Sequence, residues 1–328
     1  MDTELVRGLR GGKLAAWQQF LDRAGLDADM QVQSTVLIWE DGELIATGSR
    51  QDNLLKCIAV DPLHQGEGLT ATLLTALRQD AFQDGHNHLF LYTKPQNEFM
   101  FSSLFFYPIA KTDKVLLMEN KQSGIRAFLE SLPTEQTAGT VGAAVMNCNP
   151  FTKGHRYLIE TAARECERLY VFVLSEDKSE FSAKDRLELV KLGTADLPNV
   201  TVLPTGPYLI SSATFPTYFL KDREQAGSVQ CSLDIEIFAR YYAPHFGITH
   251  RFVGTEPLSP MTGQYNEALK AHLPERGIVL TEIPRLETGD APISATAVRQ
   301  ALDEGKDFRH LVPDTTYEYL IQGGFSHA

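Results

Sequence analysis

One short stretch, between residues 146 and 155, constrains the fold of this chain more than any other. An apolar run, Val141 to Met146, leads into Asn147-Cys148-Asn149-Pro150-Phe151-Thr152-Lys153-Gly154, and a helical pattern begins near His155. A strand that turns tightly into a helix is typical of phosphate binding, because the helix N-terminus offers unpaired N–H groups and a partial positive charge. Gly154 allows a polyphosphate to approach the backbone closely, and His155 is a donor that can also carry positive charge.

A second turn of the same kind lies about 140 residues downstream, in Ile293-Ser294-Ala295-Thr296-Ala297-Val298-Arg299. The spacing places Arg299 about one helical turn after Thr296, on the same face. Two hydroxyls and a guanidinium in this arrangement can hold a phosphate tail from the other side. The structural alternative is that Ser294 and Thr296 only cap a helix and that Arg299 is a surface charge.

The bulk properties are those of a globular chain of 328 residues, long enough for two domains. A formal net charge of −12, with no basic stripe, argues against a nucleic-acid-binding surface, so an anionic ligand needs a local cationic pocket. The four cysteines have no C-x-x-C spacing and the histidines no metal-ligand spacing, so no metal site is predicted. The first residues lack an apolar signal core and no apolar run is of membrane-spanning length, so we expect a cytoplasmic protein.

The first 120 residues are predicted to form one domain of mixed helices and strands. Helices are expected over 4–24, 71–81 and 97–104, and strands over 32–39, 44–47, 53–60, 88–93 and 114–119. Asp41-Gly42 is the predicted turn of a hairpin. A short helix and a linker without apolar periodicity, 121–139, connect this domain to the second.

The second domain, 140–328, alternates strands and helices, a pattern that predicts a parallel sheet with helices on both faces. In such sheets ligands bind beyond the carboxyl ends of the strands, and both motifs follow predicted strands. The expected strands are 141–146, 169–174, 200–203, 248–253 and 278–283.

The two motifs resemble the (His/Thr)-x-Gly-His and Ile-Ser-Ser-Thr-x-x-Arg signatures of the adenylyl-transferring nucleotidyltransferases, with Thr152 in a position that often holds histidine. The resemblance implies a Rossmann-like five-stranded sheet, ATP as substrate and Mg²⁺ on its phosphates. It implies that His155, Thr152, Lys153 and Arg299 act in catalysis, with His155 on the α-phosphate and Arg299 on the leaving pyrophosphate. It also implies ATP contacts from Asn149, Phe151, Gly154, Gly254, Glu256, Ser294 and Thr296. Tyr265 and Asn266 are further candidates, and the loops at 175–182 and 211–214 could shape an acceptor pocket.

The N-terminal domain resembles the GNAT acetyltransferases in its order of elements and in Gln65-Gly66-Glu67-Gly68-Leu69-Thr70, which matches the pyrophosphate-binding pattern of that family. Thr70 stands where the family prefers almost no side chain, and Glu67 places a negative charge where a pyrophosphate would lie. Both departures argue against productive acetyl-CoA binding and favour a docking or structural role.

Taken together, the two domains resemble the citrate lyase ligase family over nearly the whole chain, most strongly from Ala144 to Arg299. The resemblance implies an AMP-forming ligase that makes a carbon–sulfur bond: acetate and ATP give acetyl-adenylate, which acetylates the thiol prosthetic group, of dephospho-CoA type, on the citrate lyase acyl-carrier subunit. The N-terminal domain is then expected to dock that group or its carrier. Two alternatives remain open: a cofactor-biosynthesis adenylyltransferase with a phosphorylated acceptor, and an N-acetyltransferase with a nucleotide-sensing domain.

Overall fold

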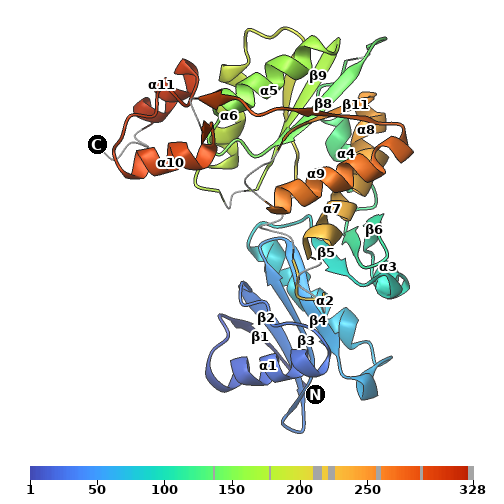
Figure 1. Ribbon diagram of the computed structural model, residues 1–328. Coiled ribbons are helices and arrows are strands. Elements are labelled where there is room, and N and C mark those ends of the chain that lie inside the picture. Colours follow the sequence, from blue (N-terminus) through green and yellow to red (C-terminus); the bar gives the residue numbers. More distant parts are fainter. Residues whose placement is uncertain are drawn as a thin grey trace. The chain divides into compact units, whose positions relative to one another are not determined.

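The computed structural model describes residues 1–135, 137–176, 179–209, 216–220, 226–255, 260–288 and 291–323 (Figure 1). The chain divides into two compact units. The first comprises 1–124 and 215–233, and the second comprises 125–214 and 234–328. The segment 215–233 was assigned to the second domain from the sequence.

The first unit is built on a seven-stranded sheet with the order β1-β2-β3-β4-β5-β7-β6, in which β4 and β5 are parallel and the other neighbours antiparallel. The apolar face of α2 packs on this sheet through Leu73, Leu74 and Leu77, which belong to its buried core. The elements are β1 (Asp2–Arg7), α1 (Gly11–Arg23), β2 (Ser34–Glu40), β3 (Glu43–Gln51), β4 (Leu54–Val60), α2 (Leu69–Gln83), β5 (Phe90–Thr93), α3 (Glu98–Ser103), β6 (Tyr107–Lys111) and β7 (Leu116–Glu119).

The predicted helix over 4–24 is wrong in its first part. Asp2–Arg7 forms β1, which pairs along its whole length with β2, and the helix begins only at Gly11. Gly8 and Gly11 have φ angles of 70° and 56°, so the backbone leaves helical geometry between the two elements. The strand β6 was also missed. The hairpin is confirmed, since Asp41 and Gly42 join β2 to β3 with φ angles of 50° and 85°.

The second unit confirms the predicted sheet of five parallel strands, with the order β10-β9-β8-β11-β12. The chain leaves β8 toward one edge and later returns to the other, so the order switches between β8 and β11. Ligands bind at such switch points in α/β sheets. The strands are β8 (Val141–Met146), β9 (Arg168–Val173), β10 (Val200–Pro204), β11 (His250–Gly254) and β12 (Val279–Ile283).

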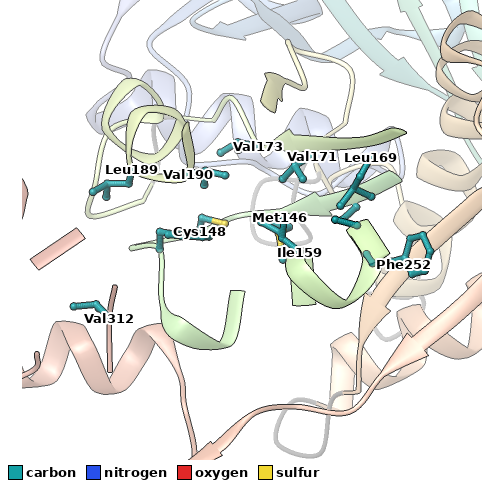
Figure 2. Packing of buried hydrophobic residues seen from close by; sticks show 14 of the residues in the cluster. Met146, Cys148, Ile159, Leu169, Val171, Val173, Leu189, Val190, Phe252 and Val312 are labelled. Carbon is teal, nitrogen blue, oxygen red and sulfur yellow. The ribbon is translucent and has the colours of Figure 1, made fainter. Parts of the chain in front are cut away.

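Helices cover both faces of this sheet, as predicted. Ile159 of α5 and Leu189 and Val190 of α6 pack with alternate strand residues, among them Val171 and Val173, in the core shown in Figure 2. On the opposite face, the Phe172 ring contacts Tyr242 and Phe246 with centroid distances of 5.3 and 5.2 Å. The helices that lie wholly in this unit are α5 (Lys153–Arg164), α6 (Ala183–Gly193), α8 (Ala243–Phe246), α9 (Pro260–His272), α10 (Ala295–Asp303) and α11 (Asp314–Gln322), the last of which was not predicted. Two further helices, α4 (Gly124–Glu130) and α7 (Ala226–Ile237), begin in residues of the first unit and end in residues of the second.

The turn after β8 is anchored in the core by Phe151, which is fully buried against the end of α6. A Cβ added at Gly193 would lie only 2.3 Å from the Phe151 ring. The absence of a side chain at Gly193 is therefore what lets the turn seat its phenyl ring.

We predict that Gly193→Ala lowers the free energy of unfolding of the second unit by about 1–3 kcal/mol, because the buried ring must shift. Urea unfolding followed by far-UV circular dichroism would measure the loss. Trp17 and Trp39, the two tryptophans of the chain, lie in the first unit, so their fluorescence monitors that unit separately. Gly12→Ala is the matched control, since nothing lies within 4 Å of a Cβ at Gly12. Equal transitions for Gly193→Ala and the control would contradict the prediction.

Candidate functional site

The helix α5 begins with reciprocal hydrogen bonds between Thr152 and His155. The Thr152 hydroxyl accepts from the backbone N–H of His155 at 3.3 Å, and the backbone N–H of Thr152 donates to His155 Nδ1 at 3.0 Å. This is a capping box in which histidine occupies the position usually held by glutamate or glutamine. The imidazole is therefore oriented by the helix start itself.

This hydrogen bond determines the tautomer of His155. A backbone N–H can only donate, so Nδ1 must be the acceptor and the ring proton of the neutral form is on Nε2. Burial, and in addition the positive charge of Arg285, lower the pKa of His155 to about 4. Without ligand, His155 is thus a neutral donor at pH 7 and does not carry the positive charge that a histidine can carry. Its Nε2 has no hydrogen-bond partner within the described ranges.

The two motifs lie side by side, although about 140 residues separate them in the chain. A Cβ at Gly154 would be 3.4 Å from the carbonyl oxygen of Ile293, and Arg299 donates a hydrogen bond to the carbonyl oxygen of Asn149. The turn at Gly154 is therefore within contact distance of the second motif. The prediction that the two turns meet at one edge of the sheet is confirmed.

Arg299 is held between three groups. Its Nη2 donates to Thr296 Oγ1 at 3.1 Å, as the helical spacing predicted, and Nη1 donates to the Asn149 carbonyl. Its Nε lies 3.4 Å from a carboxylate oxygen of Glu180, whose side chain is 46% exposed. A phosphate at Arg299 therefore has to displace only an exposed carboxylate, an interaction of small net energy.

The helix α10 presents its N-terminus beside that of α5. Ser294 is the N-cap, and its hydroxyl accepts from the backbone N–H of Ala297 at 3.1 Å. The capping role that the sequence left as an alternative is therefore present. It does not compete with anion binding, since the other N–H groups of the first turn lack intrahelical partners.

The side-chain ammonium of Lys153 is hydrogen-bonded to the backbone. Its ammonium donates to the carbonyl oxygens of Arg309 and His310 at 3.3 and 3.1 Å, and its backbone N–H donates to Leu311 at 3.0 Å. Lys153 thus fastens the segment before α11 to the start of α5.

The loop after β11 lies at the same edge of the sheet. Asn266, buried on α9, donates to the Gly254 carbonyl at 2.9 Å and to Glu282 at 3.1 Å, so it supports the loop from beneath. Tyr265 donates instead to Asp234. Glu256, Lys178 and residues 211–214 lie outside the described residues.

Two arginines that the sequence analysis did not single out organise the site. Arg186, fully buried on α6, donates to the Asn147 carbonyl at 3.0 Å, to Asn147 Oδ1 at 2.7 Å and to the Phe181 carbonyl at 3.1 Å. Its position three and four residues before Leu189 and Val190, on the apolar face, was the available signal. Arg285 follows β12, and its Nε donates to the Thr255 carbonyl at 2.9 Å.

No three or more His, Cys, Asp and Glu side chains among the described residues are grouped so as to hold a metal ion. No helix in the same part of the chain combines the length and the apolarity needed to cross a membrane.

Comparison with known proteins gives matches over both units. The family model "Citrate lyase ligase C-terminal domain" matches residues 141–320, and the model "Acetyltransferase (GNAT) family" matches residues 7–101. The citrate (pro-3S)-lyase ligase of Escherichia coli K12 is 41% identical over 96% of this chain and 92% of its own length. That of Klebsiella pneumoniae is 40% identical over 94% of this chain and 92% of its own length.

Two solved structures resemble part of the chain. Escherichia coli ElaA has a TM-score of 0.34 and 14% identity, covering 37% of this chain and 99% of its own. An acyl-CoA N-acyltransferase from Pseudomonas aeruginosa has a TM-score of 0.32 and 15% identity, covering 37% of this chain and all of its own.

We predict that the His155 imidazole is neutral at pH 7, carries its proton on Nε2 and titrates near pH 4. An unfolded histidine takes up its proton near pH ~6.5. The contribution of His155 to stability is therefore complete above that pH and is lost as the pH falls toward the folded value. Nitrogen-15 NMR of the imidazole, assigned with His155→Gln, would measure both properties. Titration above pH ~6, near the unperturbed value, or a proton on Nδ1, would contradict the assignment.

Proposed function

Because this chain belongs to the citrate lyase ligase family, we propose that it activates citrate lyase by ATP-dependent acetylation of the thiol prosthetic group on the acyl-carrier subunit. A carboxylate oxygen of acetate attacks the α-phosphorus of ATP, and pyrophosphate leaves. The thiol, losing its proton, then attacks the carbonyl carbon of acetyl-adenylate to form the thioester, and AMP leaves. The cytoplasmic location and the dephospho-CoA type of the prosthetic group stay predictions from the sequence.

The observation that carries this proposal is the pairing of two helix N-termini, α5 and α10, beyond the carboxyl ends of β8 and β12. Oriented N–H donors that are already fixed stabilise charge as it develops on a phosphorus centre, without reorganisation at the moment of reaction. Acetate needs no general base, because a carboxylate is ionised at neutral pH. The site therefore has to position the acetate ion and the phosphates of ATP and to neutralise their charge.

The polar residues of the two motifs and the residues that shape the turns have these roles. His155 donates from Nε2 to the α-phosphate, and Thr152 holds the ring in that orientation. Ser294, Thr296 and Arg299 bind the β- and γ-phosphates and so the leaving pyrophosphate. Asn149, Phe151 and Gly154 shape the turn beneath the phosphates, and Gly254 and Glu256 contact adenosine.

Lys153 is assigned to the phosphates in the same proposal. Its ammonium donates to two backbone carbonyls, so phosphate contact requires it to leave them. ATP enters as its magnesium complex, with Mg²⁺ a part of the substrate that offsets charge on the phosphates.

Pyrophosphate release is the reaction that tests this function. The complete enzyme with ATP, Mg²⁺ and acetate should release pyrophosphate, and addition of the deacetylated carrier subunit should yield AMP and the acetylated thiol. Release that ignores acetate but depends on a phosphorylated acceptor would establish a cofactor adenylyltransferase instead. Acetyl transfer from acetyl-CoA to amines, without ATP, would establish an N-acetyltransferase.

We predict that His155→Ala lowers the rate of acetyl-adenylate formation by about two orders of magnitude or more, the usual cost of removing an oriented donor to the transition state. His155→Glu is the informative companion, because Thr-x-x-Glu is itself a capping box and preserves the start of α5. It should fold normally and be at least as inactive, since it places a carboxylate beside the phosphates. The exposed His272 provides the control, as His272→Ala. A loss below about tenfold in His155→Ala would refute the assigned role.

A further inference from the structure

Arg285 is fixed at the carboxyl edge of the sheet by two bonds to one residue. Its backbone N–H donates to Thr255 Oγ1 at 3.2 Å, and its side-chain Nε donates to the Thr255 carbonyl at 2.9 Å. Thr255 in turn donates its backbone N–H to the Ile283 carbonyl at 2.9 Å, continuing the pairing of β11 with β12. The guanidinium is thus held by the loop that the proposed function assigns to adenosine.

The same residue lies close to the first motif. Leu286, its neighbour, accepts a hydrogen bond from the backbone N–H of Ile293 at 3.2 Å. The carbonyl oxygen of Ile293 is 3.4 Å from the Cβ position of Gly154, which directly precedes His155. Consistent with this chain of contacts, the charge of Arg285 contributes to the low pKa of His155. Arg285 therefore stands between the loop after β11 and the turns of the two motifs, close enough for its charge to act on the imidazole.

The phosphate of ATP that must lie between these two places is the α-phosphate, because it joins the ribose to the rest of the triphosphate. A guanidinium donates from several N–H groups in a fixed plane and suits phosphate oxygens better than any other side chain. A nearby cation disfavours protonation of a histidine, because the two positive charges repel each other. A phosphate bound between them offsets this repulsion.

We propose that Arg285 is a further catalytic residue, which together with His155 binds the α-phosphate of ATP, of acetyl-adenylate and of AMP throughout the reaction. This inference rests on the proposed function and divides the site into two parts. Arg285 and His155 hold the phosphate that the enzyme retains, whereas Ser294, Thr296 and Arg299 hold the pyrophosphate that leaves. Removing Arg285 should then impair both half-reactions, and removing Arg299 only the first.

Equilibrium binding of AMP and of ATP to the complete enzyme, by calorimetry, separates the two parts without requiring turnover. We expect Arg285→Gln to lower the affinity for both nucleotides by about tenfold or more, the loss typical of a hydrogen bond between charged groups. Arg299→Gln should lower the affinity for ATP and leave the affinity for AMP unchanged. Arg276→Gln, which removes the same charge from an exposed site of the same unit, is the control.

Several results would overturn the inference. The first is a change in AMP affinity below about threefold in Arg285→Gln, which is well under the loss expected from one hydrogen bond between charged groups. The second is a loss of affinity confined to ATP, and the third is that the unmodified enzyme does not bind AMP. Failure of the proposed function is distinguishable, because it would show as an absence of acetate-dependent pyrophosphate release in the unmodified enzyme, whatever the binding data.

The titration of His155 supplies a second readout that a purely structural role would not change. Among the described residues, the charge that lowers the pKa of the imidazole is that of Arg285 after β12. Lys153 and Arg156 on α5, Arg299 on α10 and Glu180 before α6 are further charged groups at the two motifs. Arg285→Gln should raise the pKa of His155 above about 4, toward the value of an ordinary histidine, whereas Arg285→Lys should keep it low. An unchanged titration in Arg285→Gln would mean that the guanidinium does not face the imidazole.

Discussion

The reciprocal hydrogen bonds between Thr152 and His155 are the interaction on which the site depends. They satisfy two groups that a helix start otherwise leaves unpaired, and the same two bonds leave the imidazole only one donor, at Nε2. Helix capping and the proposed catalytic role are therefore not separate features of this turn. Because the capping partner is an imidazole and not a carboxylate, the helix N-terminus keeps a donor in the place where glutamate would repel phosphate.

The parallel sheet brings the second motif to the turn at Thr152 and His155. Strands that run in the same direction end at one edge, so the turns after β8 and β12 meet although the chain between them contains most of the second unit. The turns come within contact distance at Gly154 and Ile293, and the bond from Arg299 to the Asn149 carbonyl links them. The two motifs are thus mutually supporting parts of one structure.

The sequence predicted the elements that depend on local patterns and the residues whose spacing is itself the signal. Five strands and the helix starts near His155 and Ser294 follow from apolar runs and turn residues, and the contact between Thr296 and Arg299 follows from helical geometry. The helix predicted over 4–24 failed because pairing with β2 outweighs local preference in the first residues.

Properties set by distant contacts could not be read from the sequence. The charge state of His155 depends on its burial and on Arg285, which is 130 positions away in the chain. Arg285 shows no pattern of its own, since what distinguishes it is a pair of bonds to Thr255 across two strands. Lys153 looked like a phosphate ligand by position alone, and only the structure reveals the carbonyl oxygens of Arg309 and His310 that hold it.

The electrostatics of the site can now be reconciled with a chain of net charge −12. Lys153 is held by two backbone carbonyl oxygens, and Arg299 by one carbonyl oxygen and the Thr296 hydroxyl. These neutral oxygens orient a cation through their dipoles but do not cancel its charge. Pairing with buried carboxylates would have neutralised these cations and made phosphate binding compete with strong ion pairs. Glu180 is the one carboxylate paired with them among the described residues, and it is exposed, so solvent screening weakens its hold on Arg299. The site therefore keeps its positive potential local and available, which an acidic protein needs if it is to bind a triphosphate and an acetate ion together.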